Sequence, residues 1–289
     1  MFMHQKINEY WSHLEKKHKP PTYIDKVKIL DFNKLKQEAD SRNEKYLKKL
    51  INGMYLKKEA YILRNAAPNK FKDIVLDLAN HYKKTRKPNF HKMLDRSPNF
   101  HRVITKDVTK KYKVFAVKHS FFFYNWNIKS KLEKKFKDGV YRHWRYVKLL
   151  SGNSKNQYEK NIPSDNQVDR LQIVRYPAGG GELRDHIDPR KNQRVVSGLI
   201  MSKIGEDFSK GGFYFRDKKN KKINIENKLK LGDAVVFYGS AVHGVDSVDP
   251  KIKLSWNTNK GRWFIGMFVN DSDHVKNRAT TKDLTGSVK

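Results

Sequence analysis

The chain has 289 residues and a formal net charge of +32, from 62 Lys and Arg against 30 Asp and Glu, and it contains no cysteine. The lack of cysteine excludes disulfides, thiolate zinc sites and cysteine nucleophiles. The first residues lack the apolar core of a signal peptide, and no stretch is long and apolar enough to cross a bilayer. We therefore expect a cytoplasmic protein without a membrane partner, long enough to bury a substantial core.

The positive charge is concentrated in residues 1–165, which carry 39 Lys and Arg against 16 Asp and Glu. Such a field can attract nucleic acid or an anionic substrate. The alternative is a lysine-rich solvated surface, which we favour because no arginine-rich block stands out. Nucleic acid stays open as a partner, and charge alone identifies none.

Residues 1–165 predict a mostly helical region that supports a core and covers a pocket. Residues 1–55 carry only short helical signals, and an apolar run at 61–66 predicts a strand. Apolar residues at 71–82 recur at helical spacing and predict a helix with one apolar face. Residues 128–150 carry a similar stripe that is interrupted near Gly139, and residues 114–124 predict a strand or pocket-lining segment. Trp126, His119 and Trp144 are candidate pocket residues.

From residue 166 onward, short apolar segments alternate with turns rich in Gly, Asn, Asp and Lys. Strands are expected at 171–176, 194–201, 212–215, 223–225, 234–238 and 262–269. Many short strands with turn signals are typical of an antiparallel sandwich or barrel. We expect residues 166–275 to form this core, with the N-terminal helices packed against one of its sheets and residues 276–289 as a polar tail.

His186 and Asp188 are two residues of different ligand type on either side of Ile187, shortly after a glycine run at 179–181. In an extended segment, residues i and i+2 point to one face, so the imidazole and the carboxylate can converge on one point. His243, near another predicted strand, is the candidate third ligand. Two His and one carboxylate describe the open-sided iron(II) sites of oxygenases, and a zinc hydrolase can use the same set.

The glycine run lacks the spacing of a dinucleotide or phosphate-binding loop, so it predicts a turn before the metal-binding segment. A His-x-Asp pair alone is common by chance. Further motifs in the chain strengthen the interpretation of this pair as part of a metal site. The full set is Tyr176, His186, Asp188-Pro189, Gly211-Gly212, Gly232-Asp233, His243 and Gly261-Arg262-Trp263.

Together these motifs closely resemble the iron(II)- and 2-oxoglutarate-dependent dioxygenases with a prolyl-hydroxylase-like double-stranded β-helix. The resemblance covers about residues 171–269. It implies an α+β fold whose core is a double-stranded β-helix, also called a jelly roll or cupin-like fold, with packed N-terminal helices.

The resemblance also implies roles for individual residues. His186, Asp188 and His243 match the iron ligands, and Arg262 matches the basic residue that pairs with the distal carboxylate of 2-oxoglutarate. A guanidinium suits that task because its planar fork binds a carboxylate through two hydrogen bonds. Tyr176 matches a phenol that binds the same carboxylate, and a simple core tyrosine is its alternative. Lys253 is the alternative anchor for 2-oxoglutarate, because Arg262 follows His243 at an unusually long distance in the sequence.

The implied enzyme is a hydroxylase that uses iron(II), 2-oxoglutarate and O2, oxidises an unactivated C–H bond, and releases succinate and carbon dioxide. A small metabolite or amino acid, anionic or neutral, is the preferred substrate, and a base in nucleic acid or a residue in a protein is the alternative. Phe268 stands where alkylated-base demethylases carry a second arginine, which argues against the base. Arg184 and Arg190 are candidate substrate contacts, although arginines beside carboxylates are more often structural. Desaturation, cyclisation and the oligomeric state stay open.

Overall fold

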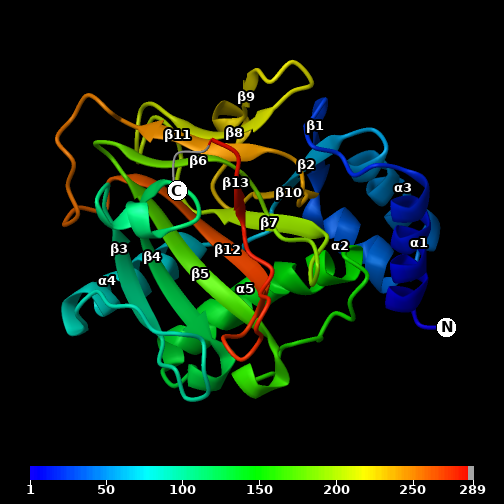
Figure 1. Ribbon diagram of the computed structural model, residues 1–289, viewed down its shortest axis with the longest axis horizontal. Helices are drawn as coiled ribbons and strands as arrows, with labels where there is room; N and C mark the ends of the chain where they lie inside the picture. The colour runs from blue at the N-terminus through cyan, green and yellow to red at the C-terminus, as the bar shows by residue number, and fades with distance from the viewer. Residues whose placement is uncertain (286–289) are drawn as a thin grey trace.

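Strands from both halves of the chain form one continuous curled sheet, as seen in the computed structural model, which describes residues 1–285 (Figure 1). In this range the strands follow the order β1-β2-β10-β7-β12-β5-β4-β6-β11-β8-β9, with β3 beside β4 and β13 beside β6. Their bounds are β1 (Lys26–Asp31), β2 (Glu59–Arg64), β3 (Phe100–Ile104), β4 (Ala116–Tyr124), β5 (Gln167–Pro177), β6 (Gly181–Ile187), β7 (Val195–Ile200), β8 (Gly212–Arg216), β9 (Lys222–Asn224), β10 (Ala234–Tyr238), β11 (His243–Val248), β12 (Gly261–Asp271) and β13 (Lys282–Asp283).

The sheet curls into two facing layers, and β4 passes from one to the other. Residues 119–124 of β4 pair with β5, whereas Ala116 and Val117 pair with β6. The larger layer contains β1, β2, β10, β7, β12, β5 and β3, and the smaller one contains β13, β6, β11, β8 and β9. Two facing layers of antiparallel strands are the architecture of a jelly roll. The predicted α+β fold class with a double-stranded β-helix core is therefore confirmed.

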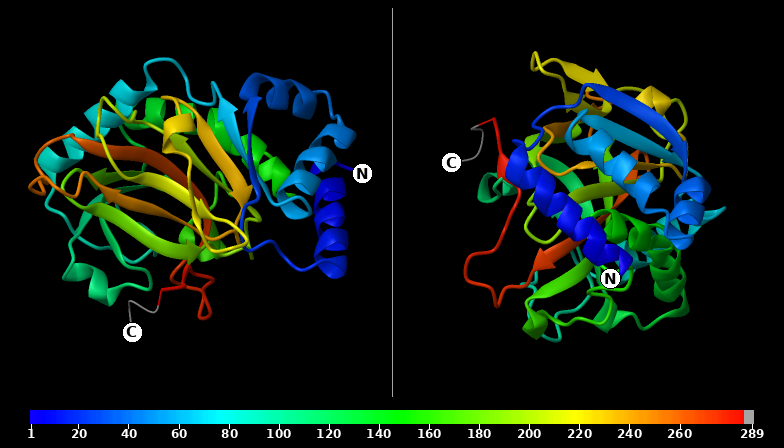
Figure 2. Two further views of the ribbon diagram at one scale, coloured as in Figure 1. Left: turned by 90° about the horizontal axis from the view of Figure 1, so that it is seen from above. Right: turned by 90° about the vertical axis from the view of Figure 1, so that its right-hand side faces the viewer.

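Five α-helices within residues 1–285 pack outside the sheet: α1 (Met3–Lys17), α2 (Phe32–Asp40), α3 (Glu44–Tyr55), α4 (Phe71–Thr85) and α5 (Lys131–Leu150). Figure 2 shows α1, α2 and α3 gathered at one end of the molecule beside β1 and β2. The largest hydrophobic cluster joins these helices to one face of β4, β5, β7 and β12. In the same range, no helix is long and apolar enough to cross a lipid bilayer.

Alternation along the strands decides which side chains reach the inside of the jelly roll. On β12, Trp263, Ile265 and Met267 belong to the cluster with the helices, whereas Arg262 and Phe264 line a cavity between the layers. Successive side chains of a strand point to opposite faces, so the even-numbered residues of β4, β5 and β12 face the cavity.

Several predicted elements are confirmed, including the helix at 71–82, the strand at 114–124 and all six strands expected after residue 166. The interruption of the helix at Gly139 is wrong, because α5 runs unbroken to Leu150. A Cβ at Gly139 would lie 2.3 Å from the ring of Phe71, so this glycine lets α4 and α5 approach closely. Residues 1–55 form three helices and a strand, more regular structure than the sequence indicated. The apolar pattern was weak there because few buried residues stand among many charged ones.

The division of the chain at residue 165 remains a prediction. β2 and β4 precede that residue and pair with β10, β5 and β6, which follow it. In the segment expected to be a polar tail, β13 pairs with β6, so this part belongs to the sheet. Residues 286–289 of that segment lie outside the described residues.

A buried ion pair fixes α5 to the start of β5. Nζ of Lys148 lies 2.9 Å from Oδ2 of Asp169, both side chains are fully buried, and the hydroxyl of Tyr141 donates to the same carboxylate at 2.7 Å. Lys148→Met is expected to lower the free energy of unfolding by about 3–5 kcal/mol, because it leaves a buried carboxylate without its counter-charge. Urea denaturation measures this loss. Lys134→Met, at an exposed position of α5, is the control, and an equal loss in both variants would contradict the prediction.

Candidate functional site

His186, Asp188 and His243 lie together between the two layers. His186 near the end of β6 pairs with His243 at the start of β11, and Asp188 directly follows β6. One ligand atom from each residue lies within 4.8 Å of the others, and Nε2 of His243 is 3.5 Å from Oδ2 of Asp188. All three are buried. The antiparallel register of β6 and β11 therefore joins the three predicted ligands into one cluster that could hold a metal ion.

The turn before β6 depends on glycine. Gly179 and Gly180 have φ angles of +95° and +120°, which side chains other than glycine rarely adopt. The glycine run is thus a turn between β5 and β6, as predicted. His186 and His243 were expected just outside strands, but both lie within strands. The strands β6 and β11 were missed because their polar residues hide the alternation of apolar side chains.

Both imidazoles are oriented by the same kind of local contact. Nδ1 of His186 lies 2.8 Å from the backbone oxygen of Arg184, and Nδ1 of His243 lies 2.9 Å from that of Ala241. A carbonyl oxygen only accepts, so in each ring Nδ1 carries the proton and donates it. The lone pair of each Nε2 is then free for a metal ion, an arrangement common among metal-binding histidines.

The protonation states suit metal binding. Burial lowers the pKa of His186 to about 4, and the neighbouring His243 lowers it as well. Burial alone would raise the pKa of Asp188, but its interactions with the neighbouring His243 and His186 outweigh burial and lower that pKa. Near neutral pH, His186 is thus a neutral imidazole and Asp188 an ionised carboxylate.

Arg262 and Tyr176 form a second group beside the metal ligands. They pair across β12 and β5, and both line the cavity although they are almost fully buried. Nε of Arg262 donates to Oε2 of Glu226 at 2.8 Å, and its guanidinium lies 5.7 and 5.6 Å from the ring centroids of Phe213 and Phe264. Its terminal nitrogens make no hydrogen bond within residues 1–285.

The hydroxyl of Tyr176 is buried without a hydrogen-bond partner in the described part of the chain. Leaving a buried hydroxyl unpaired costs about 1–3 kcal/mol, so such groups are rare unless a ligand or water completes them. The ring of Tyr176 is held parallel to that of Phe264, at 5.9 Å between centroids. A rigid phenol and a guanidinium with free N–H groups thus face one space beside the histidines.

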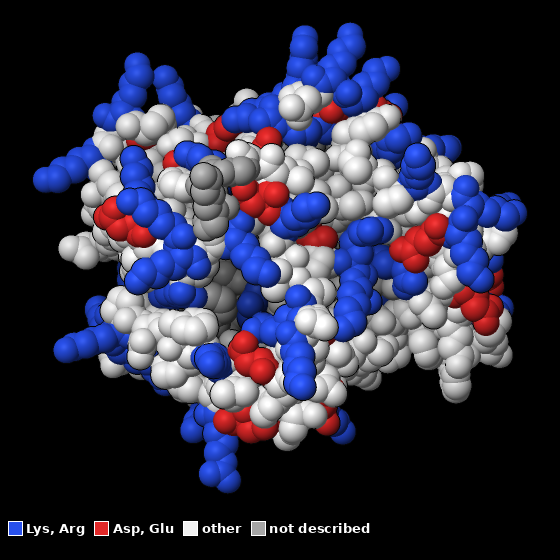
Figure 3. All heavy atoms as spheres, in the orientation of Figure 1, with Lys and Arg blue, Asp and Glu red and all other residues white. Residues whose placement is uncertain are grey.

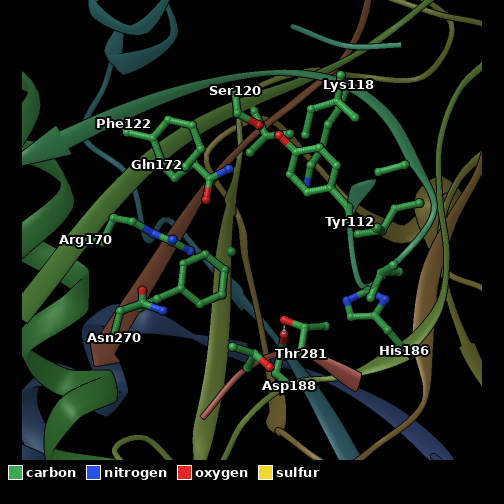
Figure 4. Close-up of a pocket in the computed structure, with 18 of the residues that line it drawn as sticks. Tyr112, Lys118, Ser120, Phe122, Arg170, Gln172, His186, Asp188, Asn270 and Thr281 are labelled. Atoms are coloured by element: carbon green, nitrogen blue, oxygen red, sulfur yellow. Dashed lines mark hydrogen bonds between the residues drawn. The ribbon is translucent and has the colours of Figure 1, made fainter. Parts of the chain in front are cut away.

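A cavity of about 590 Å³ extends from these residues between the layers. Figure 4 shows His186, Asp188 and Thr281 at one side of its open space, and Arg170, Gln172 and Asn270 at another. Thr281 donates its hydroxyl to Oδ1 of Asp188 at 3.4 Å, so the segment leading into β13 crosses directly beside the metal ligands. Part of the predicted polar tail therefore forms a wall of the site.

Solved structures share this architecture. A full-length protein from Neurospora crassa, in complex with alpha-KG and thymine, matches with a TM-score of 0.54 at 13% identity, over 86% of this chain and 86% of that chain. The same Neurospora crassa protein in complex with alpha-KG and 5-formyluracil matches with a TM-score of 0.50 at 13% identity, over 85% of this chain and 84% of that chain. A putative 2OG-Fe(II) oxygenase family protein from Caulobacter crescentus matches at 0.44 and 13% identity, over 86% and 87%. No protein-family model and no curated protein matches the chain.

The chain has the fold of the 2OG-Fe(II) oxygenases. At these identities the similarity concerns the fold alone, and the roles of individual residues depend on the geometry of this chain.

Within this oxygenase fold, the two candidate anchors for 2-oxoglutarate lie in very different places. Arg262 is buried and faces the cavity, whereas Lys253 is exposed on the loop between β11 and β12 and does not line it. The inserted loop accounts for the long separation between His243 and Arg262. The geometry therefore favours Arg262, and its role as an anchor remains a prediction.

The other candidate contacts lie away from the cavity. His119 is an odd-numbered residue of β4, so it faces the helices and contacts His101 at 2.8 Å. Trp126 and Trp144 donate to Ser97 and Asp169. Arg184 packs on the ring of Phe115, and Arg190 donates to Tyr238, so both arginines have structural contacts, as the alternative interpretation held.

The polar residues of the cavity that were missed in the sequence include Lys118, Arg170, Gln172, Asn270 and Thr281. Counting back from Tyr176 in steps of two would have found Gln172 and Arg170, because residues of one strand face share parity. Lys118 and Asn270 required the pairing of β4, β5 and β12, and Thr281 required the path of the C-terminal segment.

Proposed function

We propose that the protein is an iron(II)- and 2-oxoglutarate-dependent dioxygenase that hydroxylates a C–H bond of a small molecule. The observation that carries this proposal is the buried cluster of His186, Asp188 and His243, in which Nδ1 of each histidine is bound to a backbone oxygen. Two imidazoles and one carboxylate are the ligand set of iron(II) oxygenases, and they leave further positions open for a cosubstrate and O2. The alpha-KG complex of the Neurospora crassa protein, which shares the fold, supports the same cosubstrate.

The residues of this chain fit the two groups that the reaction needs. His186, Asp188 and His243 would hold the iron, and the free N–H groups of Arg262 with the hydroxyl of Tyr176 would bind the distal carboxylate of 2-oxoglutarate. When bound, iron(II), 2-oxoglutarate and O2 supply the oxidising chemistry, with succinate and carbon dioxide as coproducts. The protein orients these groups and, through the apolar side chains around Phe213 and Phe264, excludes water from them.

The proposal is tested first by binding, without turnover. Isothermal titration calorimetry should detect 2-oxoglutarate binding to the protein loaded with Mn(II), and much weaker binding to metal-free protein. Incubation with iron(II), 2-oxoglutarate and O2 should then release succinate. A zinc-loaded protein that hydrolyses substrates without 2-oxoglutarate would instead indicate the zinc hydrolase that shares this ligand set.

Tyr176→Phe is expected to raise the KM for 2-oxoglutarate about 10-fold, since a hydrogen bond to a charged group contributes about 1.5 kcal/mol or more. Its melting temperature should stay unchanged or rise, because the hydroxyl has no partner in residues 1–285. Steady-state succinate release and thermal unfolding measure the two effects.

Tyr82→Phe is the matched control, because the buried hydroxyl of Tyr82 donates to Glu133 far from the site. This variant should lose about 1 kcal/mol of stability and keep its KM. If Tyr176→Phe behaves in the same way, Tyr176 is only a core tyrosine.

A further inference from the structure

Polar side chains without partners line one wall of the cavity, along β4, β5 and β12. This polar wall consists of Lys118, Ser120, Arg170, Gln172 and Asn270. Buried atoms of Ser120, Arg170 and Asn270 have no hydrogen-bond partner, and the side chains of Lys118 and Gln172 make no hydrogen bond within residues 1–285. Proteins leave few buried polar groups unsatisfied, at about 1–3 kcal/mol each. A cluster of them around one open space therefore indicates a polar ligand.

The register of three strands builds the polar wall. β5 lies between β4 and β12, so Gln172 stands opposite Phe122 on one side and Gly266 on the other. A Cβ at Gly266 would lie 2.6 Å from the ring of Phe268, so the glycine lets this ring pack closely over β12 beside Gln172.

Arg170 is fixed by aromatic rings and has no acidic partner. Its guanidinium lies 5.5 Å from the ring centroid of Phe122 and 5.4 Å from that of Phe268. Neither Lys118 nor Arg170 takes part in an ion pair among residues 1–285, and Asp273, an acid that lines the cavity, pairs with Arg278. The two cations thus keep their hydrogen-bonding capacity for a ligand.

The charge of the polar wall is unbalanced. Burial lowers the pKa of Lys118 to about 8, and repulsion from Arg170 contributes to this shift. Holding two like charges together in a protected space costs free energy, which a bound anion would offset. Around the hollow in this face of the molecule, Figure 3 shows further Lys and Arg side chains, and Lys110, Lys111, Lys113 and Lys282 line an adjoining pocket. This basic rim would attract anions toward the cavity.

We propose that the substrate is a small organic anion whose charged group binds between Lys118 and Arg170, while Gln172 and Asn270 bind its other polar atoms. This inference rests on the proposed oxygenase function and specifies its substrate class. In Figure 4 the polar wall and the ligands His186 and Asp188 border the same open space, so an anion held there presents its carbon skeleton to the metal. The volume of the cavity, about 590 Å³, is that of a small-molecule binding site.

Arg170, Gln172 and Asn270 lie apart from the predicted 2-oxoglutarate site, whereas Lys118 stands near Tyr176, because its neighbour His119 pairs with Arg175. Arg170 and Tyr176 are separated by six residues of β5, about 20 Å between their Cα atoms. A five-carbon dicarboxylate that binds Arg262 and Tyr176 is too short to engage Arg170 from there. The cavity therefore offers two anion sites, one for the cosubstrate and one for the substrate.

The test compares the variant Lys118→Met/Arg170→Met with Lys218→Met/Lys219→Met, which also loses two positive charges but at exposed positions on the turn between β8 and β9. Thermal unfolding of metal-free protein is followed at constant ionic strength with benzoate, phenyl phosphate or neutral benzamide. We chose aromatic probes because Phe122 and Phe268 border the polar wall. An anion should raise the melting temperature of the wild type and of the Lys218/Lys219 variant, and should not raise that of the Lys118/Arg170 variant.

A rise with benzoate identifies a carboxylate substrate, and a rise with phenyl phosphate alone identifies a phosphorylated one. Without a probe, the Lys118/Arg170 variant should be at least as stable as the wild type, because it lacks the repulsion between the two cations. The proposal is overturned if no anion stabilises the wild type, if benzamide matches benzoate, or if the Lys118/Arg170 variant keeps the response. The assay contains neither metal nor 2-oxoglutarate. A negative result would therefore contradict the proposed substrate class, whereas the oxygenase function is tested separately by Mn(II)-dependent binding of 2-oxoglutarate.

Discussion

Asp188→Ala is expected to lower 2-oxoglutarate-dependent succinate release by more than about 100-fold, because loss of an outer contact to a metal ligand alone costs about 10–100-fold. Asp188 supplies the one carboxylate in the cluster with His186 and His243, and its ionised form is favoured by both histidines. Its removal leaves two imidazoles and no carboxylate, a poor site for iron(II). Calorimetry with Mn(II) should show the loss of metal binding, and a succinate assay should show the loss of turnover.

Glu182→Gln is the matched control for that variant. Glu182 lies on the same strand, β6, but it does not line the cavity and makes no side-chain hydrogen bond in the described part of the chain. It should retain metal affinity and succinate release. Normal Mn(II) binding by the Asp188 variant would show that the metal, if any, is held elsewhere.

The second large effect is expected for Arg262. Loss of its two terminal N–H donors should weaken 2-oxoglutarate binding about 100-fold, since two hydrogen bonds to a carboxylate contribute about 3 kcal/mol together. Lys253→Met should leave this affinity unchanged, because Lys253 is exposed outside the cavity. Calorimetric titration of the Mn(II)-loaded variants with 2-oxoglutarate measures both affinities.

The partner of Arg262 has to be changed with it. Glu226 is 2% exposed, and without the guanidinium its carboxylate would be a buried unpaired charge that costs about 3–5 kcal/mol of stability. The variant Arg262→Met/Glu226→Gln avoids this loss, and Glu226→Gln alone serves as its control. Should Lys253→Met weaken binding while the Arg262 variant does not, the anchor is Lys253 and the motif match at Arg262 is misleading.

Local patterns in the sequence were sufficient for the ligand types and for most of the jelly-roll strands. The separation of His186 and Asp188 by one residue brings an imidazole and a carboxylate to one place because alternation is a property of any extended segment. Strands such as β7, β10 and β12 were found because they are short, largely apolar runs rich in β-branched and aromatic residues between turn formers. β6 and β11 were not recognised as strands, because strands that carry metal ligands and polar side chains lack a clear apolar pattern.

The sequence by itself determined the fold class and the chemical types of the three candidate ligands, since both follow from local spacing and the order of motifs. Only the tertiary structure decided that Arg262 rather than Lys253 faces the cavity, that His119 points away from it while Lys118 points in, and that Arg170, Gln172 and Asn270 share one wall. The physical reason is that strand register and loop paths bring distant residues together, and neither can be read from spacing along the chain. The proposed substrate class is thus a consequence of how β4, β5 and β12 pair.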